Sequence, residues 1–252
     1  MYSQNDLDEA VAAGAISADS ANALRAFAER QRSTPAVDEE QFRLITGFND
    51  IFVSVAAVIL LVAVGWIGQW AGEALGTAVD EDGPSFLAPA AVAATSWGLA
   101  LFFTAKRRMA LPSILLLLAF VGAVFGTIAL TIGAAFGAAF FEDNERAVAM
   151  SLAASAAVAA GGAWLHWRRF RVPITIAAGA AAVAGTIVGL VGTAVGESPY
   201  VNDVMLGLTL LLGVGTFLFA MRWDSSDRGR ITRRSDVAFW LHLLAAPMIV
   251  HP

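Results

Sequence analysis

Histidines are the first candidates for chemistry in this chain, because it has three of them and no cysteine. His166 and His242 both lie close to the same end of long apolar runs, so the two rings could meet and ligate a haem or a metal ion. No carboxylate that could orient an imidazole lies near either histidine in the sequence. We therefore expect His166 to be a side chain at a membrane boundary and His242 a packed one, with no cofactor.

No other residue spacing points to catalysis. The sequence contains no H-E-x-x-H or G-x-S-x-G motif and no paired aspartates within an apolar run. Acidic residues gather in loops at 73–82, 142–145 and 197–203, but they lack the alternating Asp/Asn spacing of a calcium loop, so we expect them to be solvated. The absence of cysteine excludes thiol nucleophiles, disulfides and iron–sulfur clusters. The sequence therefore predicts that the protein is not an enzyme.

The composition is that of a membrane protein. Of the 252 residues, 58% are hydrophobic and only 15% are charged, and the mean hydropathy is +0.67. A soluble domain of this length has about a quarter of its residues charged. Because the apolar residues are concentrated in long runs, we expect an all-α, polytopic transmembrane helix bundle.

Six apolar runs are long enough to cross a bilayer, whose ~30 Å core needs about 20 helical residues. They cover residues 51–71, 86–105, 111–141, 147–167, 172–195 and 204–221. The third run is either one long tilted helix or a span followed by an extension. A seventh run, 237–250, has only 14 residues before the chain ends. We expect it to be part of a seventh span in a chain that is incomplete at its C-terminus; the alternative is a re-entrant or interfacial segment.

Basic residues predict the orientation. Fifteen of the sixteen Lys and Arg residues lie before the first run or in alternate loops, and Arg146 is the exception. The positive-inside rule then places the N-terminus in the cytoplasm, and the Ala- and Arg-rich composition indicates a bacterial inner (plasma) membrane. We expect the basic loops to contact anionic lipid headgroups rather than nucleic acid. The predicted lipid contacts are Lys106, Arg107, Arg108, Arg168, Arg169 and Arg171.

Small residues indicate how the helices pack. The runs at 147–167 and 172–195 are rich in Ala, Gly and Ser, which favours positions among other helices. The first and sixth runs and the first half of the third are better suited to face lipid. Glycines spaced four apart are candidates for close helix packing, within the chain or between copies. These candidates are Gly122, Gly126, Gly133, Gly137, Gly185 and Gly189.

The apolar runs contain no Asp, Glu, Lys or Arg. Ion relays and voltage sensors depend on charge within the membrane, so a secondary transporter is disfavoured. The runs do contain hydroxyl side chains, which we expect to bond to the backbone of their own helices. These are Ser54, Thr95, Ser96, Thr127, Thr131, Ser155, Thr186, Thr209 and Thr216.

Residues 1–35 are predicted to form a cytoplasmic helical hairpin, joined by a juxtamembrane linker at 36–50 to the transmembrane domain at 51–252. Gly14 has the residue type that ends a first helix, and Ser17 the type that caps a second. Two helices of this size bury little core by themselves, so the hairpin should dock on the bundle, on a second copy or on another protein. Its expected partner face consists of Leu7, Val11, Leu24 and Phe27.

The hairpin pattern, with Gly14-Ala15-Ile16-Ser17 at its centre, resembles the N-termini of some uncharacterised bacterial multi-pass inner-membrane proteins. Residues 42–66 and 239–251 are also similar to parts of such proteins. The resemblance covers about a third of the chain and implies no activity or functional residue. Two functions stay open: a non-enzymatic membrane component whose hairpin binds a partner or supports assembly, and a transporter or channel for a small neutral solute or lipid.

Overall fold

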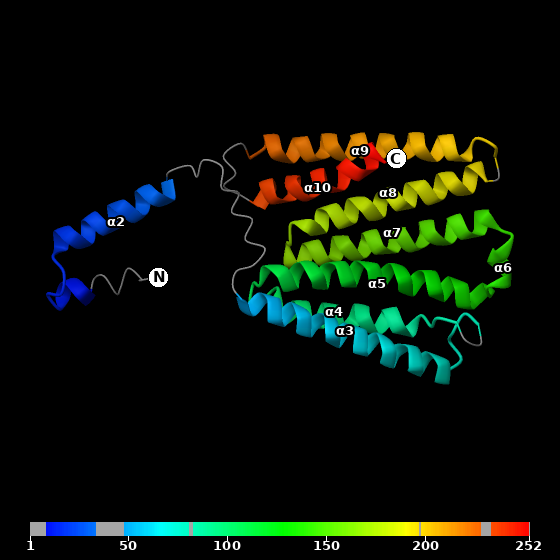
Figure 1. Cartoon of the computed structure of the whole chain (residues 1–252), viewed down its shortest axis with the longest axis horizontal. Coiled ribbons are helices and arrows are strands. Elements are labelled where there is room, and N and C mark those ends of the chain that lie inside the picture. Colours follow the sequence, from blue (N-terminus) through cyan, green and yellow to red (C-terminus); the bar gives the residue numbers. More distant parts are fainter. Residues whose placement is uncertain (1–8, 34–47, 81–82, 197, 228–232, 252) are drawn as a thin grey trace. The chain divides into compact units, whose positions relative to one another are not determined.

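A computed structural model describes residues 9–33, 48–80, 83–196, 198–227 and 233–251. The chain divides into two compact units, Met1–Arg43 and Leu44–Pro252. The first unit contains α2 (Ala18–Ser33). The second is a bundle of antiparallel helices (Figure 1). Its helices are α3 (Phe48–Ala74), α4 (Leu87–Phe103), α5 (Ala110–Phe136), α6 (Ala139–Glu142), α7 (Glu145–Phe170), α8 (Ile174–Val195), α9 (Val201–Ser225) and α10 (Arg233–Val250).

Five of these helices are long and apolar enough to cross a membrane, namely α3, α5, α7, α8 and α9. The prediction of an all-α polytopic protein is confirmed at this level. The run predicted at 86–105 forms the shorter helix α4, of 17 residues. The run predicted at 237–250 lies within α10, which begins at Arg233 and contains Pro247.

The third apolar run is a span followed by an extension. Helix α5 ends at Phe136. The next residue, Gly137, has a φ of 77°, a backbone angle that residues with a Cβ atom rarely adopt. The four-residue helix α6 follows, and α7 then begins after Asn144, whose side chain accepts a hydrogen bond from the backbone N–H of Ala147. The glycine therefore separates the spanning helix from its short extension.

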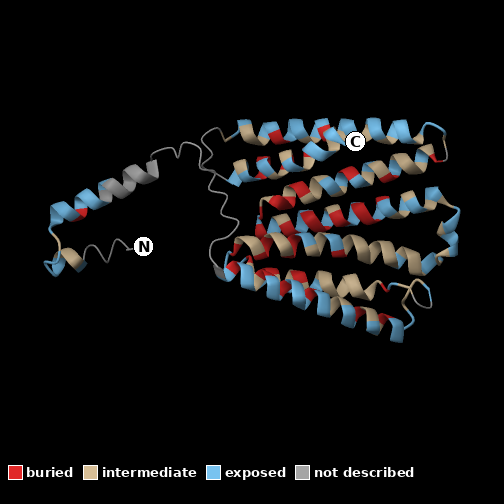
Figure 2. Cartoon of the chain, in the orientation of Figure 1, coloured by how far each residue is buried: buried red, intermediate tan, exposed pale blue. Residues whose placement is uncertain are grey.

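Consecutive helices pack side by side across the bundle, with α5 against α7 and α10 against α8 as well as α9 (Figure 1). The buried share of the most apolar part of the helix is 33% for α7 and 28% for α8, but only 11% for α9 (Figure 2). The small-residue helices thus lie among their neighbours, as their composition predicts.

The prediction that the first half of the third run faces lipid is wrong. Leu116 and Leu117 on α5 are fully buried in a cluster with Ala57, Ala100 and Phe170. Leucine is as compatible with a helix interface as with lipid, so its frequency does not distinguish the two surroundings. The positions of the neighbouring helices determine which leucines are covered.

The Gln69 side chain on α3 makes three hydrogen bonds, two of which join it to the connection between α3 and α4. Its Nε2 donates to Gly83 O at 3.0 Å and to Glu73 Oε1 at 2.9 Å, and its Oε1 accepts from the Ser85 N–H at 2.8 Å. Buried Ser85 fits against Gly72 so closely that a Cβ at that glycine would overlap it. These contacts fix residues 83–85 against the end of α3.

Gln69→Ala should lower the free energy of unfolding by about 1–2 kcal/mol, because it removes the partner of the part-buried Ser85 N–H. Glu73→Ala is the matched control: it removes only the exposed bond to Gln69 Nε2 and leaves the bonds to Gly83 and Ser85 in place, so the loss should be smaller. Equilibrium unfolding in mixed micelles measures both. Equal stability of the alanine variant and the unaltered protein would contradict this role.

In the N-terminal unit, residues 9–12 are helical and Gly14 has a φ of 68°. The Ala15 N–H donates to Ala10 O at 2.9 Å and the Gly14 N–H to Val11 O at 3.0 Å, the two bonds of a Schellman motif. Ser17 Oγ then accepts from the Ser20 N–H at 3.1 Å at the start of α2. These bonds end the first helical segment at Gly14 and begin α2 after Ser17.

Candidate functional site

The largest fully buried polar side chain among the described residues is His166 on α7. Its ring centroid lies 4.5 Å from that of Phe170, 5.9 Å from Phe120 on α5 and 6.0 Å from Trp97 on α4. Its Nδ1 lies 3.4 Å from Thr175 Oγ1, and its Nε2 has no hydrogen-bond partner among the described residues. An aromatic cluster from three helices therefore surrounds one imidazole.

The structure corrects the expectation for His166, which is a core residue rather than a boundary side chain. His242 packs elsewhere, with its ring centroid 5.2 Å from that of Phe217. In the part of the chain that the structure describes, no three His, Asp or Glu side chains are grouped closely enough to hold a metal ion. Sequence spacing missed the cluster because its rings come from α4, α5 and α7.

Hydroxyl groups in the apolar helices follow two patterns. Most donate to the carbonyl four residues earlier in their own helix, as predicted. These are Thr127, Thr131, Ser155, Thr186, Thr209 and Thr216. The prediction is wrong for Ser54 and Ser96, whose buried Oγ atoms bond to no group among the described residues. Buried hydroxyls without a partner are uncommon, so each of these two needs an explanation.

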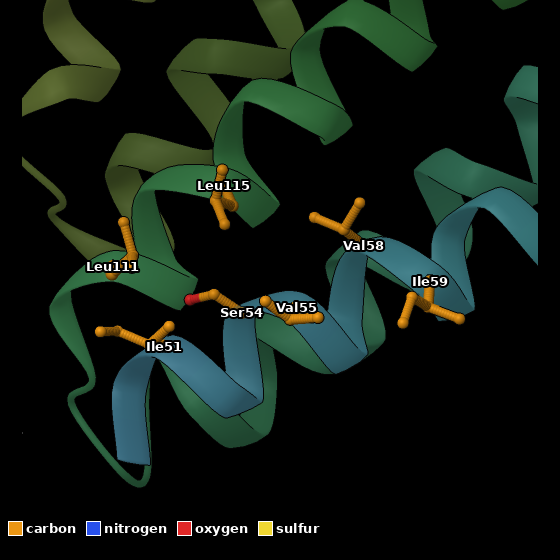
Figure 3. Close-up of a pocket in the computed structure, with 7 residues that line it drawn as sticks. All are labelled: Ile51, Ser54, Val55, Val58, Ile59, Leu111 and Leu115. Atoms are coloured by element: carbon orange, nitrogen blue, oxygen red, sulfur yellow. The ribbon is translucent and has the colours of Figure 1, made fainter. Parts of the chain in front are cut away.

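A shallow groove of about 320 Å³ surrounds one of these hydroxyls (Figure 3). Its walls are apolar side chains of two helices, and Ser54 Oγ points into the space between them (Figure 3). The lining residues are Ile51, Ser54, Val55, Val58 and Ile59 of α3 with Leu111 and Leu115 of α5. The groove was not anticipated, because it needs α3 and α5 to lie side by side.

Aromatic rings accompany the basic residues at this end of the bundle. Lys106 and Arg107 lie over the Phe102 ring, at 5.8 and 5.4 Å from its centroid. In the second cluster Arg168 lies over Trp164, Arg169 over Phe170 and Arg171 over Trp167. Such cation–ring pairs at a helix end suit the boundary between lipid and water. The rings and aliphatic stems can contact lipid there while the charged groups stay in water.

The six glycine candidates have different surroundings. A Cβ at Gly189 would lie 2.8 Å from Ala149 O, whereas a Cβ at Gly185 would make an ordinary 3.5 Å contact with Ala156, also on α7. Gly126 and Gly133 face Pro89 and Val79 respectively. Gly122 and Gly137 have no described atom within 4 Å of a Cβ position. The structure thus brings four of the six against neighbouring segments of the same chain.

Of the predicted hairpin face, Leu24 is 48% exposed and Val11 is partly exposed. Leu7 and the side chain of Phe27 lie outside the described residues.

Five spanning-length helices around an apolar interior define the class of this chain, a multi-pass helical membrane protein. Comparisons with protein-family models, with curated proteins and with solved structures found no match.

Proposed function

We propose that the chain is a non-enzymatic component of a bacterial inner membrane whose N-terminal residues 1–35 bind a cytoplasmic protein partner or a second copy. The observation that carries the proposal is the division of the chain into two compact units, residues 1–43 and residues 44–252. A unit as small as the first buries little apolar surface by itself. Leu24, 48% exposed, offers an apolar anchor for a partner.

The proposed topology has six complete spans, including α4, and a partial seventh in α10. The N-terminus and the basic loops then face the cytoplasm. Two features support this arrangement: the distribution of basic residues over alternate loops, and the antiparallel course of consecutive helices. The N-terminal unit would therefore meet soluble partners.

The bundle supports a scaffold role more than a solute pathway. Six hydroxyls in its helices donate their protons to carbonyls of their own helices, so these protons are not available to a solute. Helices α7 and α8 pack through small residues, which leaves little space between them.

Deleting residues 1–35 should abolish a specific crosslink in living cells while the bundle still inserts. Crosslinking of the full-length and shortened proteins, followed by mass spectrometry, measures this. Leu24→Ser should weaken the same crosslink several-fold, and Ala23→Ser, at the adjacent exposed position, should leave it unchanged. Identical crosslinking patterns for the full-length and shortened proteins would contradict the proposal, and solute flux into liposomes would then be measured.

A further inference from the structure

The α3–α5 groove lies on the outside of the bundle, where a membrane protein meets lipid. Val55 and Val58, on its α3 wall, are 53% and 44% exposed. Both helices are of membrane-spanning length. A groove lined by aliphatic side chains at such a surface has the shape and polarity to hold a hydrocarbon chain.

Positive charge stands at one end of this groove. Leu111, which lines it, follows Arg108 by three residues, and Lys106 and Arg107 directly precede Arg108. The Phe102 ring lies under the Lys106 and Arg107 side chains, at the end of α4. Charge of this sign at the membrane surface attracts a phosphate-bearing headgroup.

Ser54 supplies a polar contact at an intermediate depth. It lies six residues into α3 from Phe48, about 9 Å along the helix at 1.5 Å per residue. Ser54 is also the fourth residue of the apolar run that begins at Ile51, so it lies near the end of the span rather than at its centre. Ser54 is 3% exposed, its Oγ lacks a partner among the described residues, and it points into the groove (Figure 3). An ester carbonyl at this depth would accept its proton.

We propose that the α3–α5 groove is a binding site for one anionic phospholipid molecule. One acyl chain lies along Val55, Val58 and Leu115. The phosphate lies against Lys106, Arg107 and Arg108. A glycerol-ester carbonyl accepts a hydrogen bond from Ser54 Oγ–H. The site combines a groove, a charge and a donor, which ordinary contact between a basic loop and the bilayer surface does not require. It does not depend on a partner of the N-terminal unit.

Native mass spectrometry of the full chain, titrated with phosphatidylglycerol in micelles, tests this site through the affinity of the first bound lipid. Val58→Trp fills the groove and should weaken binding by roughly tenfold or more. The same substitution at Leu60, which is 44% exposed on another face of α3 and does not line the groove, should have no effect. Both positions are exposed, so neither tryptophan disturbs the core, and far-UV circular dichroism verifies folding.

The charges have a matched control in the same chain. Gln at positions 106, 107 and 108 should weaken phosphatidylglycerol binding by about tenfold or more, since each basic residue near a membrane surface adds to the attraction of an anionic lipid. Gln at 168, 169 and 171 removes an equal charge from a loop that contributes no residue to the groove, and it should change the first binding event by less than about twofold. Phosphatidylcholine should bind the unaltered protein more weakly than phosphatidylglycerol.

Ser54→Ala should weaken binding of the ester-linked lipid by about fivefold, the effect of one hydrogen bond. An ether-linked phosphatidylglycerol, which lacks the carbonyls, should bind the unaltered protein and the alanine variant equally. Two outcomes would overturn the proposal: unchanged binding in Val58→Trp, or equal losses in the two triple-glutamine variants. Either would mean that the basic loops attract lipid through charge alone.

Discussion

Replacing Trp97 with alanine is expected to lower the free energy of unfolding of the bundle by about 3 kcal/mol, at the low end of the range for large aromatic residues because Trp97 is only partly buried. Its ring centroid lies 5.2 Å from that of Phe120 and 5.1 Å from that of Phe170, and it also contacts His166. Removing it leaves rings of α5 and α7 without the α4 residue that joins them, and lipid cannot enter to replace it.

Trp66→Ala is the control for this substitution. Trp66 is 74% exposed on α3, so lipid or detergent replaces the lost contacts and we expect a change below about 0.5 kcal/mol. Equilibrium unfolding of both variants in mixed micelles gives the comparison. The cluster around His166 would not be the stabilising centre of the bundle if Trp97→Ala proved no more harmful than Trp66→Ala.

Gly189→Ala should destabilise the bundle by about 1–3 kcal/mol, the usual effect of inserting a methyl group into a packed interface. A Cβ at Gly189 would lie 2.8 Å from Ala149 O and 2.8 Å from Ala153 Cβ, so α7 and α8 would have to move apart. Backbone atoms form part of this contact and cannot rotate away as a long side chain can.

Gly185→Ala provides a matched control one turn away on the same helix. Its Cβ would make an ordinary 3.5 Å contact with Ala156, and alanine is the better helix former, so we expect no loss of stability. Thermal unfolding of the two variants measures the difference. If both substitutions were equally tolerated, the close approach of α7 and α8 at Gly189 would not be a determinant of their packing.

This pair shows why the glycine spacing was insufficient. Gly122 and Gly126 repeat the same four-residue interval as Gly185 and Gly189, yet Gly122 faces no described atom within 4 Å. The interval only places two glycines on one face of a helix. Whether another helix covers that face depends on the whole bundle.

The hydroxyl residues and leucines make the same point. A threonine in a helix always has a carbonyl four residues before it, so the bonds of Thr127 and Thr209 follow from local geometry. Ser54 and Ser96 belong to the same class of residue, and yet their oxygens are buried without such bonds. Likewise, Leu116 is buried and Leu118 is 48% exposed, although they lie two residues apart in one apolar run.

The amino-acid sequence was sufficient for the features that depend on local composition: the helical class, the apolar segments and the helix ends at Gly14 and Ser17 follow from short-range physics. The enclosure of His166, the burial of the first half of α5 and the groove at Ser54 came only from the folded bundle. Each of these three features brings together residues from two or three helices. The contacts between helices depend on the shape of the whole interface, and no single stretch of sequence contains that shape.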